Sequence, residues 1–375
     1  MLPYFCRSLV RPLSVSSFDV QFGPQYHFSH YFSQGKVLKR GIWEDAFQVR
    51  DPEIKSLAKS LPSVMMAALA PKTTDKYGRG WGRWVDWAQT KHEVTVLPAD
   101  AFYVAIFLNH LVVTHGTVGA IRDAVYGINW AHHASGYISP TEDPFVKLVH
   151  KGAERLCAKP RSKKDPLTAP FMKALYDHYR PLSGSRPDLK ILRFLLIAML
   201  GFAGFFRIEE LLSTKLTNVH VYGDHMTIFL PKCKTDQLRQ GNTVYIARLG
   251  SRYCPVGLLE DFLSAANIRL PAVADEHLIP RLIKVRGGHK IHPSLGISDT
   301  TAREVFATHI QVISKGGLKF SPHSLRAGGA SEAAHHDVGD RLISLHGRWK
   351  SGKARDGYIQ DALEARLTVS KSLGL

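Results

Sequence analysis

Four separated stretches in the second half of the chain carry side chains suited to phosphate chemistry. The first, GFAGFFRIEELL, places Arg207 directly after an apolar segment and Glu210 one helical turn further on. A charge at the end of a buried helical face needs a partner or a ligand. Glu210 can be that partner and leave part of the guanidinium fork of Arg207 free to bind an anion. Taken alone, such a pair is more commonly a structural ion pair.

The second and third stretches add further cations. PKCKTDQ places Lys232 and Lys234 in a loop between two expected strands, where a lysine can swing over a substrate or is simply solvated. In SPHSLRAGGAS, Pro322 precedes a helix start, and His323 and Arg326 lie one turn apart at its beginning. Free backbone N–H groups at a helix start favour an anion. A histidine, an arginine and these amides together indicate a phosphate site.

The fourth stretch, HGRWKSGKARDGYI, contains His346, Trp349 and Tyr358. A tyrosine is a possible nucleophile, although tyrosines that anchor a core or a surface are far commoner. An imidazole can move a proton, whereas an indole offers a phosphate one N–H donor and little else. Residue types alone favour His346 as the chemical companion of Tyr358.

The composition favours a nucleic-acid partner. The 375 residues carry a formal net charge of +17, which suits a polyanion, with a merely soluble basic protein and a membrane-surface protein as rivals. The longest uncharged apolar run, residues 194–206, is too short to span a bilayer. We therefore expect a soluble protein with no membrane partner.

The cysteine pattern argues against metal and disulfide frameworks. No CxxC pair exists, which fits a reducing compartment, either the nucleus or the cytoplasm. The first 18 residues contain Arg7, Arg11 and several serines but no acid, and so faintly resemble an organelle transit segment. An unstructured start is an equal alternative. The four widely spaced cysteines are Cys6, Cys157, Cys233 and Cys254.

The elements that must position these groups fall into two domains. Residues 1–54 show no sustained periodicity and are expected to be a poorly ordered extension. Residues 55–157 follow a helical period, in which Trp81, Trp84 and Trp87 share one face, and predict a small all-α domain. Thr73 or Thr74 is the expected cap of that tryptophan helix.

A basic linker, residues 158–169, follows this helical domain. Its prolines and cations suit an extended segment lying on DNA phosphates, although a solvated charge run would have the same composition. The cations that we expect to contact DNA are Lys159, Arg161, Lys163 and Lys164.

The second domain, residues 170–375, is expected to be mostly helical with a small antiparallel β-sheet. Three short runs near residues 219–221, 226–230 and 243–247 have the period of strands. Helices are expected on both sides of them, including one long helix over 188–215.

The order Arg, Lys, His-x-x-Arg, Trp, Tyr resembles the signature of the tyrosine recombinase (phage integrase) family. Arg207-Ile-Glu-Glu210-Leu matches its first motif, and His323-Ser-Leu-Arg326 matches its His-x-Leu-Arg motif. Trp349 stands nine residues before Tyr358, where the family carries His or Trp ahead of its nucleophile. The resemblance covers about residues 55–370, and it makes His346 a helix-end or packing residue.

The resemblance implies a fold and an activity. The fold would be a SAM-like helical core-binding domain followed by an α+β catalytic domain. The activity would be site-specific cleavage and rejoining of double-stranded DNA through a 3′-phosphotyrosine, as in DNA integration by mobile elements. No metal, nucleotide cofactor or small-molecule substrate is implied, and a homotetramer on paired sites is. The implied catalytic residues are Arg207, Lys234 (or Lys232), His323, Arg326, Trp349 and Tyr358, with Glu210 in support.

Three other functions are weighed against this one. A domesticated, non-catalytic DNA-binding protein would be expected to lose at least one of these positions. A type IB topoisomerase-like enzyme would relax supercoils without paired sites. A metal-dependent hydrolase would use His132 and His133, or His335 and His336, but adjacent helical histidines diverge and no acidic cluster accompanies them.

Overall fold

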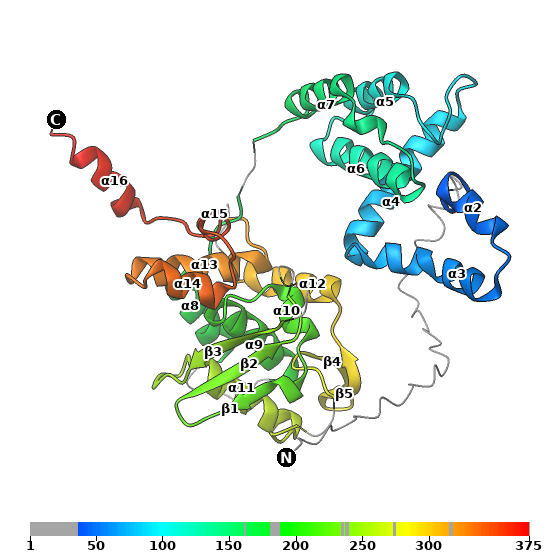
Figure 1. Cartoon of the computed structure of the whole chain (residues 1–375). Helices are drawn as coiled ribbons and strands as arrows, with labels where there is room; N and C mark the ends of the chain where they lie inside the picture. Colours follow the sequence, from blue (N-terminus) through cyan, green and yellow to red (C-terminus); the bar gives the residue numbers. More distant parts are fainter. Residues whose placement is uncertain are drawn as a thin grey trace, which may run out of the picture. The chain divides into compact units, whose positions relative to one another are not determined.

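The computed structural model describes residues 37–160, 163–180, 188–233, 236, 240–272, 275–314 and 318–374. The chain divides into two compact units, Met1–Arg161 and Ser162–Leu375, and each is described by itself (Figure 1). Both are mainly helical, and the second contains small antiparallel sheets, as the sequence predicts. Within the described ranges, no helix is both long and apolar enough to cross a bilayer.

The first unit is all helical. Three of its helices begin at polar capping residues, because Asp100, Thr117 and Asp143 each accept a backbone N–H of the first turn. Its elements are η1 (Val37–Lys39), α2 (Ile42–Gln48), α3 (Pro52–Ala67), α4 (Pro71–Gln89), α5 (Ala101–Thr114), α6 (Val118–Ala134), η2 (Pro140–Glu142) and α7 (Pro144–Leu156).

The tryptophan helix, α4, differs from its expected form at the start. It begins at Pro71 after Ala70, so Thr73 and Thr74 lie inside its first turn rather than capping it. Its glycines serve packing against α6: a Cβ on Gly80 would lie 1.8 Å from the carbonyl oxygen of Asp123. The close approach of these helices requires glycine there, and Trp81 is fully buried in the resulting core.

The expectation of a poorly ordered extension through residue 54 is corrected for its last part. Residues 37–54 contain η1, α2 and the start of α3. Ser135 donates its hydroxyl to Val37 O at 2.9 Å, and the indole of Trp43 donates to Ala134 O at 2.6 Å. These long-range contacts fix a segment that has no internal period. The possible transit segment, residues 1–18, lies outside the described residues.

His132 is a fully buried histidine whose two ring nitrogens both contact the backbone. Its Nε2 accepts the N–H of Ala99 at 2.8 Å, so Nδ1 carries the proton that points to Ile128 O at 2.7 Å. Burial lowers the pKa of His132 from 6.5 to about 4, although the hydrogen bond to Ile128 opposes this shift. Both ring nitrogens therefore have structural partners, which leaves neither for a metal.

We expect the first unit to lose stability as the pH falls from about 6.5 towards 4. The unfolded chain takes up a proton on His132 in that window and the folded chain does not, so protonation favours unfolding. The free energy of unfolding should fall by about 3 kcal/mol. Urea unfolding followed by tryptophan fluorescence, at pH 7 and pH 4.5, measures it. His132→Gln should flatten this pH dependence, and parallel profiles for the two proteins would contradict the assignment.

The second unit packs helices around a long buried helix, α9. The sheet order is β1-β2-β3, all antiparallel, and this sheet lies beside α9 and α11 (Figure 1). Its helices and 3-10 turn are α8 (Ala169–Tyr179), α9 (Leu189–Ala203), α10 (Ile208–Ser213), η3 (Leu216–Asn218), α11 (Pro255–Ala266), α12 (Asp299–Gln311), α13 (Pro322–His335), α14 (Asp340–Gly347), α15 (Gly352–Asp356) and α16 (Leu363–Lys371). Its strands are β1 (Val219–Val221), β2 (His225–Leu230), β3 (Asn242–Ala247), β4 (Pro280–Val285) and β5 (Gly288–Gly296).

The long helix expected over 188–215 is two helices. α9 ends at Ala203, and Phe205 then adopts a left-handed backbone with φ of 47°. Helix α10 begins after Arg207, whose backbone N–H donates to Glu210 Oε2 at 3.0 Å. Phe205 and Phe206 are both buried, so the apolar pattern of the sequence continues through this corner. Hydrophobic periodicity therefore does not reveal the break between α9 and α10. The break places Arg207 at a helix start.

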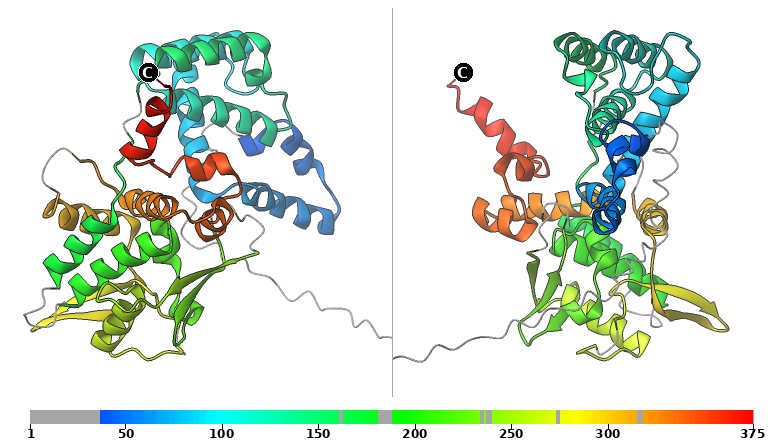
Figure 2. Two further views of the ribbon diagram at one scale, coloured as in Figure 1. Left: turned by 90° about the vertical axis from the view of Figure 1, so that its left-hand side faces the viewer. Right: turned by 45° about the vertical axis from the view of Figure 1, so that its right-hand side comes forward.

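A further sheet was not predicted. β4 and β5 form a hairpin that projects from the body of this unit in the right-hand view of Figure 2. Its sequence, PRLIKVRGGHKIHPSLG, carries cations where a half-buried strand would alternate apolar and polar residues. The last helix, α16, extends away from the unit and buries no residue (Figures 1 and 2).

Candidate active site

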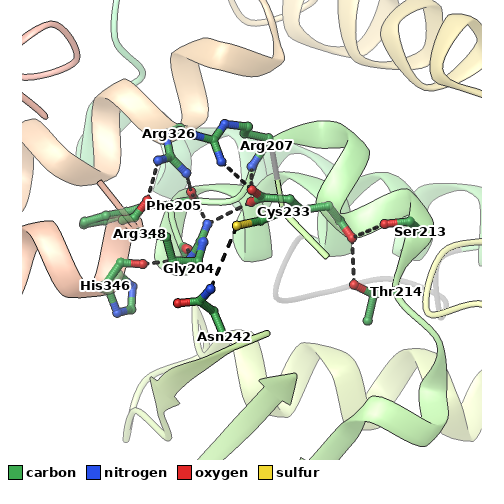
Figure 3. Close-up of polar contacts among 12 residues, drawn as sticks. Gly204, Phe205, Arg207, Ser213, Thr214, Cys233, Asn242, Arg326, His346 and Arg348 are labelled. Carbon is green, nitrogen blue, oxygen red and sulfur yellow. Dashed lines mark hydrogen bonds and ion pairs between the residues drawn. The ribbon is translucent and has the colours of Figure 1, made fainter. Parts of the chain in front are cut away.

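One buried carboxylate joins two arginines at the start of α10. Arg207 donates from Nη1 to Glu210 Oε1 at 2.6 Å, and Arg348 donates from Nη2 to Glu210 Oε2 at 2.9 Å. The Glu210 side chain is only 4% exposed. The structural ion pair expected for Arg207 is therefore present, and it is shared with a second guanidinium (Figure 3).

Arg326, on α13, lies against the same corner. It donates from Nη1 to Phe205 O and from Nη2 to Gly347 O (Figure 3). Its side chain is fully buried. Helix α13 can pack closely against Leu167 because residue 328 is a glycine. A Cβ at this position would lie only 1.9 Å from the carbonyl oxygen of Leu167. The small residues that follow His323 and Arg326 thus allow close backbone packing.

Trp349 and Tyr358 cover the guanidinium of Arg326. Its Cζ lies 4.3 Å from the centre of the Trp349 ring and 5.1 Å from that of Tyr358. The two rings lie 5.3 Å apart. The segment after Tyr358 is attached to α13, because Gln360 N donates to Ser331 Oγ at 2.9 Å. The structure therefore brings an arginine, an indole and a tyrosine together.

His346 points elsewhere. Its Nε2 lies 2.8 Å from Ala203 O, and its ring packs edge-on against Phe205. Burial, assisted by the charges of Arg348 and Arg326, lowers the pKa of His346, although the hydrogen bond to Ala203 opposes this. A neutral imidazole that donates to a backbone carbonyl is a packing residue at the end of α14.

Three buried donors in this cluster lack an acceptor. Among the described residues, Arg326 Nε and Trp349 Nε1 are buried side-chain nitrogens without a hydrogen-bond partner, and so is Arg348 Nε. A buried donor left unpaired costs about 1–3 kcal/mol, so it is rare without a reason. The donors on Arg326 and Trp349, two side chains in contact, are available to the acceptor oxygens of a ligand.

Arg348 is the site residue that the sequence did not reveal. It adopts a left-handed backbone with φ of 58°, and its side chain is 2% exposed. Besides Glu210, it donates to Gly204 O at 3.1 Å, His346 O at 2.7 Å and Phe205 O at 2.8 Å. Arginines are mostly exposed, and its partners are remote in sequence. Its position beside Trp349 was the only available signal.

The cluster keeps its charges despite burial. Burial would raise the pKa of Glu210, but Arg348, the backbone N–H of Arg207 and the guanidinium of Arg207 hold it below its ordinary value. Burial and the charges of Arg207 and Arg348 lower the pKa of Arg326 to about 9. Arg326 is therefore still protonated at neutral pH. Three guanidiniums and one carboxylate leave this region two charges positive, which suits a phosphodiester.

Of the other predicted groups, the structure describes His323 and Lys232. His323 is exposed in the first turn of α13, three residues before Arg326. Lys232 is exposed beyond the end of β2, and the next residue, Cys233, accepts the side-chain amide of Asn242 on its sulfur at 3.9 Å (Figure 3). Lys234, which follows Cys233, is outside the described residues.

The basic linker is divided between the two units. Lys159 is exposed just beyond the end of α7 in the first unit, and Lys163 and Lys164 are exposed in the second. Lys164 O accepts the side-chain amide of Gln360 at 3.4 Å. Arg161 lies outside the described residues. No group of three or more His, Cys, Asp or Glu able to hold a metal occurs in the part of the chain that the structure describes.

Comparison with known proteins gives a sequence relative. The integrase/recombinase xerD homolog of Selenomonas ruminantium is 27% identical over 297 residues, which cover 78% of this chain and 82% of that protein. No family model matches the sequence.

Solved structures give the fold. The XerH site-specific recombinase bound to a palindromic difH substrate, a post-cleavage complex, matches with a TM-score of 0.56 at 14% identity over 93% of this chain and 96% of that chain. The Tn1549 transposon integrase bound to transposon right end DNA matches with a TM-score of 0.51 at 11% identity, over 78% of this chain and 92% of that chain. The chain has the tyrosine recombinase fold, and its sequence is similar to that of the xerD homolog over most of both chains.

Proposed function

We propose that the protein is a site-specific DNA recombinase or integrase, which cleaves and rejoins DNA through a 3′-phosphotyrosine. The observation that carries this proposal is the pair of unpaired buried donors, Arg326 Nε and Trp349 Nε1, beside the ring of Tyr358. A phosphodiester supplies the missing acceptor oxygens, and the adjacent tyrosine supplies a nucleophile.

The arginines would stabilise the transition state. Charge builds on the two non-bridging oxygens when phosphorus becomes five-coordinate, and fixed donors there lower the barrier. Arg207 and Arg326 would bind these oxygens with forks that lysine cannot match. Trp349 would add one N–H donor. Glu210 would orient the arginines rather than touch DNA, because it is buried and already paired.

Proton transfer would be divided among three side chains. Tyr358 attacks phosphorus and forms the phosphotyrosine bond, while the 5′-oxygen leaves and needs a proton. Lys234 would supply that proton, with Lys232 as the alternative from the same loop. His323, at the start of α13, would assist transfer near the tyrosine or brace the phosphate. No metal or nucleotide is needed.

The partner would be double-stranded DNA. The two matched proteins were solved with a palindromic difH substrate and with transposon right end DNA, which supports a DNA partner here. The linker cations Lys159, Arg161, Lys163 and Lys164 would contact its backbone, which gives affinity and steep salt dependence. Recombination of two sites would require a homotetramer. The exposed apolar residues of α16, such as Leu363 and Val369, suit docking on a neighbouring subunit.

Capture on suicide DNA tests the function. Duplexes with a nick next to the cleavage position, built from candidate element termini, trap the protein because the short product strand diffuses away. Covalent protein–DNA complexes, sequenced from the attached strand, are the expected result. Binding without any covalent complex on all substrates would instead support a non-catalytic DNA-binding protein.

A further inference from the structure

The most deeply buried charge pair of the site contains Arg348, which has no part in the proposed chemistry. Arg348 and Glu210 are 2% and 4% exposed in their side chains, and their atoms Nη2 and Oε2 lie 2.9 Å apart. A charge pair at this depth is costly to bury, and removing one partner leaves the other uncompensated. Its presence in a catalytic corner therefore calls for a physical role.

The contacts of Arg348 all face inwards. Its two terminal nitrogens bind three backbone carbonyls, those of Gly204, Phe205 and His346, as well as Glu210. Its Cζ also lies 5.1 Å from the ring centre of Phe206. The side chain is thus enclosed by the α9–α10 corner and the end of α14. Its two terminal nitrogens make four hydrogen bonds to protein atoms, which leaves neither of them a donor for a phosphate.

The same atoms hold the groups that would bind phosphate. Phe205 O accepts from both Arg348 and Arg326, and Glu210 accepts from both Arg348 and Arg207. Arg348 therefore shares one acceptor with each proposed catalytic arginine (Figure 3). Without it, the second oxygen of Glu210 would compete with phosphate for Arg207 and Arg326.

We infer that Arg348 is a positioning residue: it neutralises Glu210 and fixes the α9–α10 corner, so that Arg207 and Arg326 keep their donors for phosphate. This inference rests on the proposed function. A displacement of about 1 Å in such groups can lower a rate by about 100-fold. Arg348→Met should therefore lower single-turnover cleavage at saturating DNA by about 100-fold. The Kd for DNA should change by less than about threefold, because Arg348 does not touch DNA.

The linked variant Glu210→Gln separates positioning from general damage. Glutamine keeps the shape of Glu210 but removes the charge that Arg348 neutralises. The double variant Arg348→Met with Glu210→Gln should therefore cleave faster than the product of the two single losses predicts, by about tenfold or more. If the two substitutions damaged the structure independently, their fold-losses in cleavage rate would multiply, and that result would contradict the inference.

A neutral phosphate distinguishes positioning from contact. Methylphosphonate DNA replaces one charged oxygen by a methyl group, so an arginine that contacts that oxygen becomes less important. The loss caused by Arg207→Lys should shrink on this DNA, and the loss caused by Arg348→Met should not. A selective rescue of Arg348→Met would assign it to the phosphate and overturn the inference.

Two further variants control for the loss of an arginine and for failure to fold. Arg303→Met, which removes an arginine from the half-exposed pair with Asp299 on α12, should cleave as the unchanged protein does. If Arg348→Met does not fold, Arg348→Lys keeps the charge with fewer donors and should lose about tenfold in rate with the same Kd. A wild-type protein that forms no covalent complex contradicts the proposed function. A wild type that cleaves no faster than Arg348→Lys and Arg348→Met contradicts only the role of Arg348.

Discussion

Tyr358→Phe is expected to abolish the covalent DNA complex while DNA binding is retained. The substitution removes only the hydroxyl, so the ring still packs against Trp349 and Arg326. Loss of a nucleophile in an enzyme costs about 10⁴-fold or more in rate. Denaturing gels of suicide DNA should show no shifted band, and equilibrium binding should give an unchanged Kd.

A second tyrosine controls for the loss of a hydroxyl. Tyr245, on β3, is 63% exposed and lies outside the Arg326 cluster. Tyr245→Phe should form the covalent complex at the rate of the unchanged protein. Adducts that survive Tyr358→Phe would move the nucleophile to another residue and remove the basis of the proposed mechanism.

Arg326→Lys is expected to have the next largest effect. Lysine keeps the positive charge but cannot bind Phe205 O and Gly347 O while also presenting a donor to a phosphate oxygen. A lost transition-state donor of this kind costs about 3–4 kcal/mol, or about 10²–10³-fold in cleavage rate. Single-turnover cleavage at saturating DNA measures it, since weaker binding then has no effect on the rate.

The fold must be checked separately, because Arg326 is fully buried. Thermal unfolding of Arg326→Lys gives the loss of stability, and Arg303→Lys on α12 is the matched substitution at a half-exposed ion pair. The account expects a folded variant that binds DNA and cleaves slowly. A folded Arg326→Lys with an unchanged rate would mean that Arg326 only supports the corner between α9 and α10.

Local signals in the sequence were enough for most elements. Asp100, Thr117 and Asp143 mark helix starts, and strand periodicity marks β1–β3. Motif order placed Arg326, Trp349 and Tyr358 in one site before any geometry was known. Trp349, rather than His346, faces Arg326, as the spacing of nine residues before Tyr358 had indicated.

Features set by long-range contacts were invisible in the sequence. The corner after α9 interrupts an apolar run whose residues stay buried on both sides of the break. The β4–β5 hairpin lacks the alternation of a half-buried strand. Arg348 is identified only by its partners, Glu210 and the carbonyls of the corner. No pattern over neighbouring residues encodes such a contact.

The most direct test of the central claim is mapping of the DNA-linked residue by mass spectrometry. Covalent complexes from suicide DNA are digested with trypsin and nuclease, and the modified peptide is sequenced. The expected product is the peptide of residues 356–366, DGYIQDALEAR, carrying a nucleotide phosphate on Tyr358, its single tyrosine. End-labelling should show that the phosphate comes from a 3′ end. A nucleotide on any other peptide, or a 5′ linkage, would contradict the assignment of Tyr358 as nucleophile.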